Sequence, residues 1–468
     1  MRCCTVGQVT IDTLPDDALL YVFDFYLAQA SKVEAWHTLV HVCRRWRILV
    51  FVSPRRLNLR IECTNKTRAV KEKLDVWPAL PVVISRDFST TTGSDNLKAA
   101  LEHHNRICQI NLYLVGLKDI NIASLLEEPF PILTDLDLGT FIVFRPLDPN
   151  PSKFLGGPGC ARLLRSLTLR HVGIPGLLKL LLATPNLVLL RLDAIRSSFL
   201  PDEMVTILSS LARLEILDLD IEFDRSHPDW ENQNLPLPRR TVLPSLTMLK
   251  VTGDIEDSED FMARIDTPLL DHLYMPFFFD PFDRTMALDT PQLLRFISRT
   301  PKLQAPVGAY IGFSADIIWI FFLHSTRVSH HVVRLKISGV SPKRQAPCVA
   351  QFCRSLPFPL HALEYLYIYG GERRQRNRTN RNRWLELLQP FAAVKNLYLT
   401  KVFASHIAHA LQGLAGERVM EVLPTLENVF IEEFEPSGPV HQVIKAFVVA
   451  RQLAGHPITI SRWGLSTL

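Results

Sequence analysis

The chain has 468 residues, of which 47% are hydrophobic and 21% charged, and its formal net charge is +5. This length predicts two or three folded units or one repeat array, and the apolar content excludes a disordered chain. So small a net charge gives no support for a nucleic-acid partner or an anionic membrane surface, and we expect neither.

The first residues and the cysteines indicate the compartment. Residues 1–12 contain no long apolar core of the kind a secretory signal needs, and the longest apolar run, residues 317–323, is too short to span a bilayer. The eight cysteines follow neither a disulfide framework nor a zinc-binding spacing. We therefore expect a reducing compartment, the cytosol or the nucleus.

Residues 11–50 have a helical pattern. Pro15 suits a first helical turn, and Asp16 and Asp17 lie where the helix dipole favours negative charge. Two apolar patterns follow, one up to Leu27 and one ending at Trp46. They hold more large apolar groups than about 40 residues can bury alone. The surplus must dock onto the rest of the chain, onto a second protein or onto both. A simple helical cap on the next domain is the alternative interpretation.

The order Leu14-Pro15, Val22-Phe23 and Val42-Cys43-x-x-Trp46 resembles an F-box. F-box proteins are the substrate receptors of SCF-type cullin-RING ubiquitin ligases, so the resemblance implies binding to a Skp-type adaptor and through it to a cullin. The segment departs from the family at Ala18, where a larger apolar residue is usual, and in the longer link over residues 28–35. By resemblance, the adaptor-facing residues are Leu14, Pro15, Leu19, Leu20, Val22, Phe23, Leu39, Val42, Cys43 and Trp46.

Most of the remaining chain repeats one six-residue motif, apolar-x-x-apolar-x-apolar. Successive copies lie 23 to 32 residues apart, except for one gap of 62 that predicts a degenerate copy near residues 303–313. Alternate apolar positions are typical of a short strand with one buried face, and the motif resembles the strand of a leucine-rich repeat. The copies begin at Ile107, Leu133, Leu164, Leu187, Leu214, Leu246, Leu270, Val332, Leu363, Val394 and Leu426.

Helical patterns separate the motifs, and a proline often precedes the next motif. This order predicts an α/β fold: a small all-helical F-box over 11–50, then an irregular leucine-rich-repeat-like β/α solenoid over 51–468, curved as a horseshoe with its strands inside. A generic open parallel sheet is the alternative. The predicted helices cover residues 175–184, 203–212, 291–298, 384–389 and 440–453. Further predictions are a first strand at 55–60 and a C-terminal cap over 458–468.

Several kinds of chemistry have no motif in this sequence. There is no phosphate-binding glycine loop, no Gly-x-Ser-x-Gly elbow, and no Cys/His array of the RING or HECT kind. We therefore predict no catalytic residue, no cofactor and no metal, and a chain that is not an enzyme.

Three segments stand apart from the repeats. Arginines cluster over residues 373–383 and acidic residues over 254–260, and both clusters predict solvated loops. The role of the arginine cluster stays open. The phenylalanine-rich stretch 275–282 predicts a buried plug, with an exposed partner site as the alternative.

These features predict the substrate-recognition subunit of an SCF-type E3 ubiquitin ligase, in which the repeat array binds an unknown protein substrate. The array would act by proximity and orientation, because it has no chemistry of its own. The alternative is an F-box/leucine-rich-repeat scaffold that acts outside ubiquitin transfer.

Overall fold

We analysed a computed structural model of the chain. It describes residues 11–29, 35–52, 59–63, 70–77, 79–85, 93–113, 126–140, 154–157, 160–174, 176–195, 201–220, 240–278, 290–324, 331–356, 360–370, 381–414, 416–435 and 438–464. The chain divides into two compact units, Met1–Arg196 and Ser197–Leu468.

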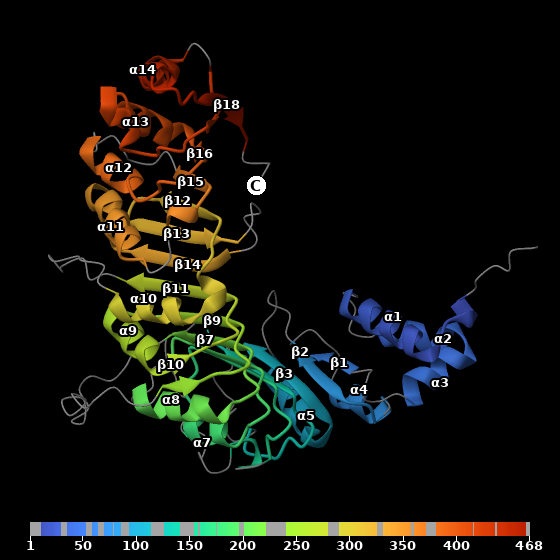
Figure 1. Ribbon diagram of the computed structural model, residues 1–468. Helices are drawn as coiled ribbons and strands as arrows, with labels where there is room; N and C mark the ends of the chain where they lie inside the picture. Colours follow the sequence, from blue (N-terminus) through green and yellow to red (C-terminus); the bar gives the residue numbers. More distant parts are fainter. Residues whose placement is uncertain are drawn as a thin grey trace, which may run out of the picture. The chain divides into compact units, whose positions relative to one another are not determined.

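The first unit begins with helices and continues with β/α repeats (Figure 1). Within its described residues, six strands are neighbours in chain order, and every pairing from β1 to β6 is parallel. Parallel neighbours in chain order are what a β/α repeat produces. The elements are η1 (Ile11–Thr13), α1 (Asp16–Gln29), α2 (Ala35–Val42), α3 (Arg44–Val52), β1 (Leu59–Glu62), α4 (Val70–Val76), β2 (Val82–Ser85), α5 (Ser94–Leu101), η2 (His104–Arg106), β3 (Ile107–Tyr113), β4 (Asp135–Gly139), η3 (Phe154–Gly156), β5 (Ser166–Arg170), α7 (Leu177–Leu182) and β6 (Leu189–Asp193).

The second unit continues the alternation, and helices α9 to α13 lie along one side of its strands (Figure 1). Its elements are α8 (Pro201–Ser210), β7 (Ile216–Asp220), β8 (Thr241–Val242), β9 (Met248–Thr252), α9 (Ile255–Arg264), β10 (Ile265–Asp266), β11 (His272–Phe278), α10 (Pro291–Arg299), η5 (Pro301–Leu303), β12 (Gly308–Phe313), β13 (Ile317–Leu323), β14 (His331–Ser338), α11 (Pro342–Ser355), η6 (Leu360–Ala362), β15 (Tyr365–Gly370), α12 (Arg381–Leu388), β16 (Asn396–Leu399), α13 (Lys401–Leu411), η7 (Gly416–Met420), β17 (Asn428–Glu432), α14 (Pro439–Leu453) and β18 (Thr459–Trp463).

All eleven predicted motif copies overlap a strand, so the repeat prediction is confirmed at the level of the strands. The fourth and sixth motif positions, such as Leu249 and Val251 of β9, are fully buried. The helices predicted from residues 175, 203, 291, 384 and 440 are also present. The horseshoe curvature, the boundary between residues 50 and 51 and the F-box identity of the helices stay predictions.

One backbone arrangement explains the constant two-residue gap in the motif. The carbonyl of the second motif residue accepts two N–H groups from the next repeat. The carbonyl of Thr247, for example, accepts the N–H groups of Asp271 and His272 at 2.8 and 3.0 Å. The same double acceptance recurs at Glu364 and Lys395. Main-chain groups therefore join successive repeats.

The second unit interrupts its repeat order between β11 and β15. The neighbours run β11, β14, β13, β12, β15, so the chain crosses from β11 to the far position and returns as an antiparallel meander. Strand β12 fills the predicted degenerate copy, yet it pairs with β15 and not with β11. Strand β14 takes the place beside β11.

The acidic segment 254–260 is not a loop, and that prediction was wrong. It forms the start of α9, where Asp254 caps the helix by accepting the Asp257 N–H at 2.8 Å. The side chain of Glu259 accepts the N–H groups of Gln292 and Leu293 at 2.6 and 2.8 Å, and so caps α10. Asp254 and Glu259 thus satisfy two helix starts, and Asp260 pairs with Arg264 at 2.9 Å.

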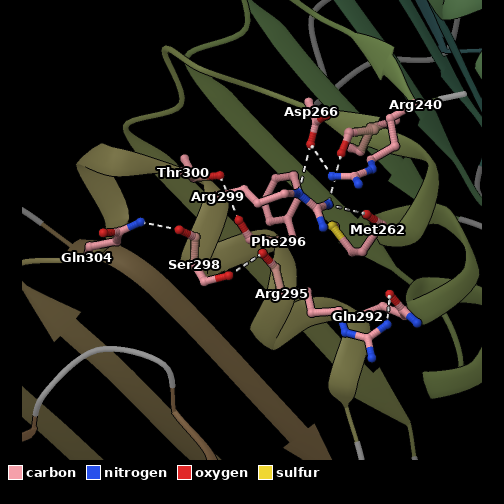
Figure 2. Close-up of polar contacts among 11 residues, drawn as sticks. Arg240, Met262, Asp266, Gln292, Arg295, Phe296, Ser298, Arg299, Thr300 and Gln304 are labelled. Carbon is pink, nitrogen blue, oxygen red and sulfur yellow. Dashed lines mark hydrogen bonds and ion pairs between the residues drawn. The ribbon is translucent and has the colours of Figure 1, made fainter.

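Polar contacts tie α10 to the small parallel sheet of β8 and β10 (Figure 2). Arg299 Nε donates to Asp266 Oδ1 at 2.8 Å, and Arg240 Nη1 lies 3.6 Å from the same oxygen. Arg299 also reaches the carbonyls of Met262 and Ile265, each at 3.4 Å. One arginine thus connects two successive repeats.

The two remaining segments have separate outcomes. Met275, Pro276 and Phe277 are buried in β11, as the plug predicts, whereas Phe278 is 52% exposed. Residues 279–282 lie outside the described residues, as do 371–380, which hold most of the arginine cluster.

Candidate functional site: two binding surfaces

The first candidate surface is the helical segment α1–α3, where the predicted adaptor residues fall into three classes. The buried members are Leu19, Leu20, Phe23 and Leu39. The half-buried members are Leu14, Cys43 and Trp46. The exposed members are Pro15, Val22 and Val42. Only the last class is exposed at the surface, with Val22 at 47% and Val42 at 54%.

The less exposed members hold the three helices together. The rings of Phe23 and Trp46 pack with centroids 4.7 Å apart, joining α1 to α3. Arg45 forms an ion pair with Asp16 at 2.5 Å and donates to the carbonyl of Leu14 at 2.6 Å. The Leu-Pro-Asp start and the Cys-x-x-Trp end are therefore in contact in the fold.

Cys43 lies at the junction of α2 and α3. Its Sγ accepts the N–H of Trp46 at 3.4 Å, which is the position of an N-cap acceptor. The helical segment also contacts the first repeat, because Trp36 packs edge-on against Trp77 with centroids 5.8 Å apart. Both tryptophans are buried, at 5% and 8% exposure.

Large apolar side chains remain exposed on this segment. The described residues include eighteen exposed large hydrophobic side chains, and half of these lie within residues 11–52. On α1, the exposed Tyr21, Val22, Phe25 and Tyr26 cover the part of the helix surface that the buried Leu19, Leu20 and Phe23 leave free. Exposed apolar groups concentrated in one segment are typical of a docking surface. The nine are Ile11, Tyr21, Val22, Phe25, Tyr26, Val42, Ile48, Phe51 and Val52.

The second candidate surface is the face of the second unit's strands that alternates with the buried leucines. Strand register places one residue from each of seven neighbouring strands directly opposite the next. Six are aromatic, and we call them the aromatic row. In spatial order they are Tyr274, Phe321, Tyr310, Tyr367, Tyr398 and Phe430, with Arg334 between the first two.

The rings of the aromatic row stack on one another. Tyr367 lies 4.3 Å from Tyr398, and Tyr398 lies 4.5 Å from Phe430, with interplanar angles of 13° and 11°. Tyr310 stacks on Phe321 at 5.5 Å. Ring faces therefore contact ring faces at these three steps, whereas Tyr310 and Tyr367 are tilted by 42°. Phe321 and Tyr367 are buried within the row, at 7% and 4% exposure.

The neighbouring row adds a glycine and a tryptophan. Gly312 has no side chain, and the ring of Tyr369 occupies the space where a Cβ would lie. This brings the rings of Tyr369 and Tyr310 to 4.2 Å. On the other side, Trp319 lies beneath Lys336, whose Nζ is 5.3 Å from the ring centroid.

Cations contact the rings of this surface, and one of them, Lys250 of β9, lies opposite Tyr274 with its Nζ 6.0 Å from the ring centroid. The Arg334 guanidinium lies over the rings of Tyr274, Phe321 and Trp319, at 4.7, 5.0 and 5.6 Å from their centroids. Lys336 is two residues further along β14, on the same face. The surface thus combines aromatic and guanidinium groups, the side chains enriched at energetic centres of protein interfaces.

The surroundings of four tyrosines on this face favour the neutral hydroxyl. Burial raises the pKa of Tyr310, Tyr367 and Tyr398 above the ordinary value. Burial also raises the pKa of Tyr369, while the charge of Arg334 offsets part of that rise. Neutral hydroxyls can donate hydrogen bonds to a ligand but do not act as bases near neutral pH.

Four buried cysteines have thiols that resist ionisation. Burial raises the pKa of Cys63, Cys348 and Cys353 from 9.0 to about 12, and that of Cys108 to about 11. Within the described residues, no group of three or more His, Cys, Asp or Glu side chains could hold a metal ion. No helix of the described part is long and apolar enough to cross a membrane.

Sequence reasoning missed the aromatic row, although part of its signal is visible. The fifth motif position is aromatic in four of the later copies, at Tyr274, Tyr367, Tyr398 and Phe430. The motif alignment would place Lys336 in the row, but β14 pairs with β11 two residues out of that alignment and places Arg334 there.

No protein-family model and no curated protein matches the chain. Among solved structures, it is similar to a leucine-rich-repeat-containing protein of Legionella pneumophila, with 13% identity, a TM-score of 0.28, and coverage of 86% of this chain and 99% of that one. A leucine-rich-repeat protein of Leptospira interrogans gives 14% identity, a TM-score of 0.28, and coverage of 86% and 88%.

Proposed function

We propose that this chain is the substrate-recognition subunit of an SCF-type E3 ubiquitin ligase. In this proposal α1–α3 bind a Skp-type adaptor, and through it a cullin, while the strand face of the second unit binds a protein substrate. The observation that carries the proposal is the gathering of half of the exposed large apolar side chains within residues 11–52. Such a surface needs a partner to cover it.

The face of α1 supports a helix-docking partner. Val22 and Phe25 are 47% and 69% exposed, while Phe23 between them is fully buried. A helix with apolar groups on both faces buries one face in its own domain and offers the other to a groove or helix of a second protein. The resemblance of the same residues to an F-box names that protein as a Skp-type adaptor.

The strand face supports a protein substrate. Its aromatic row and Arg334 provide the side-chain types that dominate protein–protein binding energy. Neither surface carries a catalytic group, so the chain would act by holding its substrate near a ubiquitin-transferring partner. The proposal implies a cytosolic or nuclear location, where SCF ligases act.

Co-purification with a Skp-type adaptor tests the proposal. Val22→Asp/Phe25→Asp/Val42→Asp should abolish recovery of the adaptor, because three exposed apolar side chains become charged while the buried Phe23 is untouched. A matched control is Val76→Asp/Leu182→Asp/Leu453→Asp, which alters three exposed apolar residues elsewhere and should leave recovery unchanged.

The outcomes separate the two interpretations of the N-terminal segment. Undiminished recovery by the first variant, or none by the wild type, would exclude adaptor binding through this surface. Adaptor recovery without any cullin or ubiquitinated partner would favour the scaffold acting outside ubiquitin transfer.

A further inference from the structure

Arg334 and Lys336 are the only two positively charged side chains on β14, and both lie on its open face. Their neighbours across the strands are not acidic. Arg334 lies opposite Tyr274 and Phe321, and Lys336 lies opposite Pro276 and Trp319. Within the part of the chain that the structure describes, neither cation forms an ion pair.

Other lysines near this face are neutralised one strand away. Lys250 of β9 forms an ion pair with Asp218 of β7 at 2.9 Å. Lys395, next to β16, pairs with Glu364, next to β15, at 2.8 Å. The aromatic neighbours of β14 thus replace the carboxylates that cations receive elsewhere in the same array.

The surroundings of Arg334 dispose it to bind an anion. Three rings contact the guanidinium, and its Nε is buried without a hydrogen-bond partner among the described residues. Aromatic faces favour a cation but accept little of its hydrogen-bonding capacity. A carboxylate can take two parallel N–H bonds from one guanidinium, and low local polarity strengthens them.

We propose that Arg334 and Lys336, framed by Tyr274, Phe321 and Trp319, form the anchor for an acidic polypeptide segment whose Asp or Glu carboxylate binds Arg334. This inference deepens the proposed substrate-receptor function and rests on it. The adjoining aromatic row, with its neutral hydroxyls, contacts the residues that flank the carboxylate.

The geometry favours a polypeptide over a nucleic acid. Single-stranded nucleic acid needs free ring faces for its bases and a continuous track of cations for its phosphates. Here the ring faces of Tyr367, Tyr398 and Phe430 are occupied by one another. The next lysines along the array, Lys250 and Lys395, already have carboxylate partners. Two adjacent unpaired cations suit one or two carboxylates.

The test pans a random-sequence peptide display library against the full-length chain. The wild type should enrich peptides that contain Asp or Glu, and Arg334→Gln/Lys336→Gln should lose that enrichment. The matched control is Lys302→Gln/Lys395→Gln, which removes two lysines that already pair with Asp271 and Glu364 and should keep it. Thermal unfolding verifies that each variant is folded. If the variant that contains Arg334→Gln does not fold, Lys336→Gln alone replaces it in the test.

An enriched peptide and its Glu→Gln or Asp→Asn counterpart then enter a double-mutant cycle. Either change alone should weaken binding about 30-fold, the loss expected of a central interface residue. Combining them should add little, because each removes the same contact. Arg334→Lys should restore only part of the affinity, since an ammonium lacks the guanidinium fork.

Several results would overturn the inference: enrichment without acidic residues, equal enrichment by Arg334→Gln/Lys336→Gln, dependence on phosphorylation of the peptide, or preferential binding of a single-stranded oligonucleotide. Adaptor recovery is measured on the same preparations. If the wild type recovers the adaptor but enriches no acidic peptides, the anchor at Arg334 is overturned and the proposed ligase function is not. Absence of adaptor from the wild type overturns the proposed ligase function and leaves the peptide result standing.

Discussion

The ring of Tyr369 lies against Gly312 of the neighbouring strand, in the space that any other residue would fill with its Cβ. Gly312→Ala would place that carbon on the Cε1, Cζ and hydroxyl oxygen of the ring. We expect a loss of about 2 kcal/mol in unfolding free energy, measured by chemical denaturation, since overpacking a well-filled site costs about that much. Tyr369→Ala in the same chain should recover part of the loss. A fully additive double variant would contradict the contact.

Glu259 should contribute to stability through the start of α10. Its two oxygens accept the N–H groups of Gln292 and Leu293, which have no acceptor within their own helix. Glu259→Ala should lower the unfolding free energy by about 1 kcal/mol, as loss of a helix cap does. The control is Glu386→Ala on α12, an exposed residue that should change stability by less than about 0.5 kcal/mol. Equal effects would argue against a capping role.

Cys43 should tolerate serine better than alanine. Its Sγ accepts the Trp46 N–H at the start of α3, and a hydroxyl is the stronger acceptor for that position. Cys43→Ser should match or exceed the wild-type melting temperature, whereas Cys43→Ala should lose up to about 1 kcal/mol of stability. Differential scanning fluorimetry compares the three chains. A serine variant less stable than the alanine variant would exclude the capping role.

The raised pKa values of the buried thiols predict how these cysteines react and how the stability of the fold changes at high pH. With pKa values near 12, Cys63, Cys348 and Cys353 hold about one thiolate in ten thousand at pH 8. Site-resolved alkylation should therefore modify them only after unfolding, and the half-buried Cys43 and Cys160 earlier.

The same three thiols determine how the stability of the fold depends on pH. The native state favours the neutral thiol, so this contribution to stability is fully present below the ordinary pKa of 9.0 and is lost as pH rises from 9.0 toward 12. Denaturation midpoints should fall over that range. Replacing Cys63, Cys348 and Cys353 by alanine should flatten the fall, and an unchanged pH profile would contradict the assignment.

Trp77 fluorescence reports on removal of the N-terminal helices. Trp36 covers it in the fold, so a chain without residues 1–52 should expose Trp77 and show red-shifted tryptophan emission. The repeats should still unfold cooperatively, because main-chain bonds such as those to Thr134 join them independently of α1–α3. Loss of cooperative unfolding would mean that the helices are an integral cap.

The sequence predicted the strands well because their signal is local. In copies such as Leu246-x-x-Leu249-x-Val251, every position that defines the strand lies within six residues, and the buried face follows from alternation. The loop prediction for residues 254–260 was wrong for the opposite reason. Glu259 accepts main-chain N–H groups of α10, some 33 residues away, whereas the acidic composition of the segment alone suggests a solvated loop.

The candidate surface depended even more on distant contacts. In the sequence, residues 317–323 stand out only as the longest apolar run. Their antiparallel insertion between β12 and β14 has no local signature. The two-residue offset of β14 decides whether Arg334 or Lys336 joins the aromatic row, and it depends on pairing with β11. Resemblance named the N-terminal helices, but only the three-dimensional contacts separate the buried Phe23 from the exposed Val22.

The reversed order of β12, β13 and β14 has a consequence for synthesis on the ribosome. A regular repeat array can add each strand to the last one as it emerges. Here β11 cannot meet its neighbour until β12 and β13 have already left the ribosome, because that neighbour is β14. The nascent chain therefore carries an open strand edge through this interval, and unpaired edges invite pairing with other chains. The strands that frame Arg334 are thus the part of the array most dependent on protection during folding.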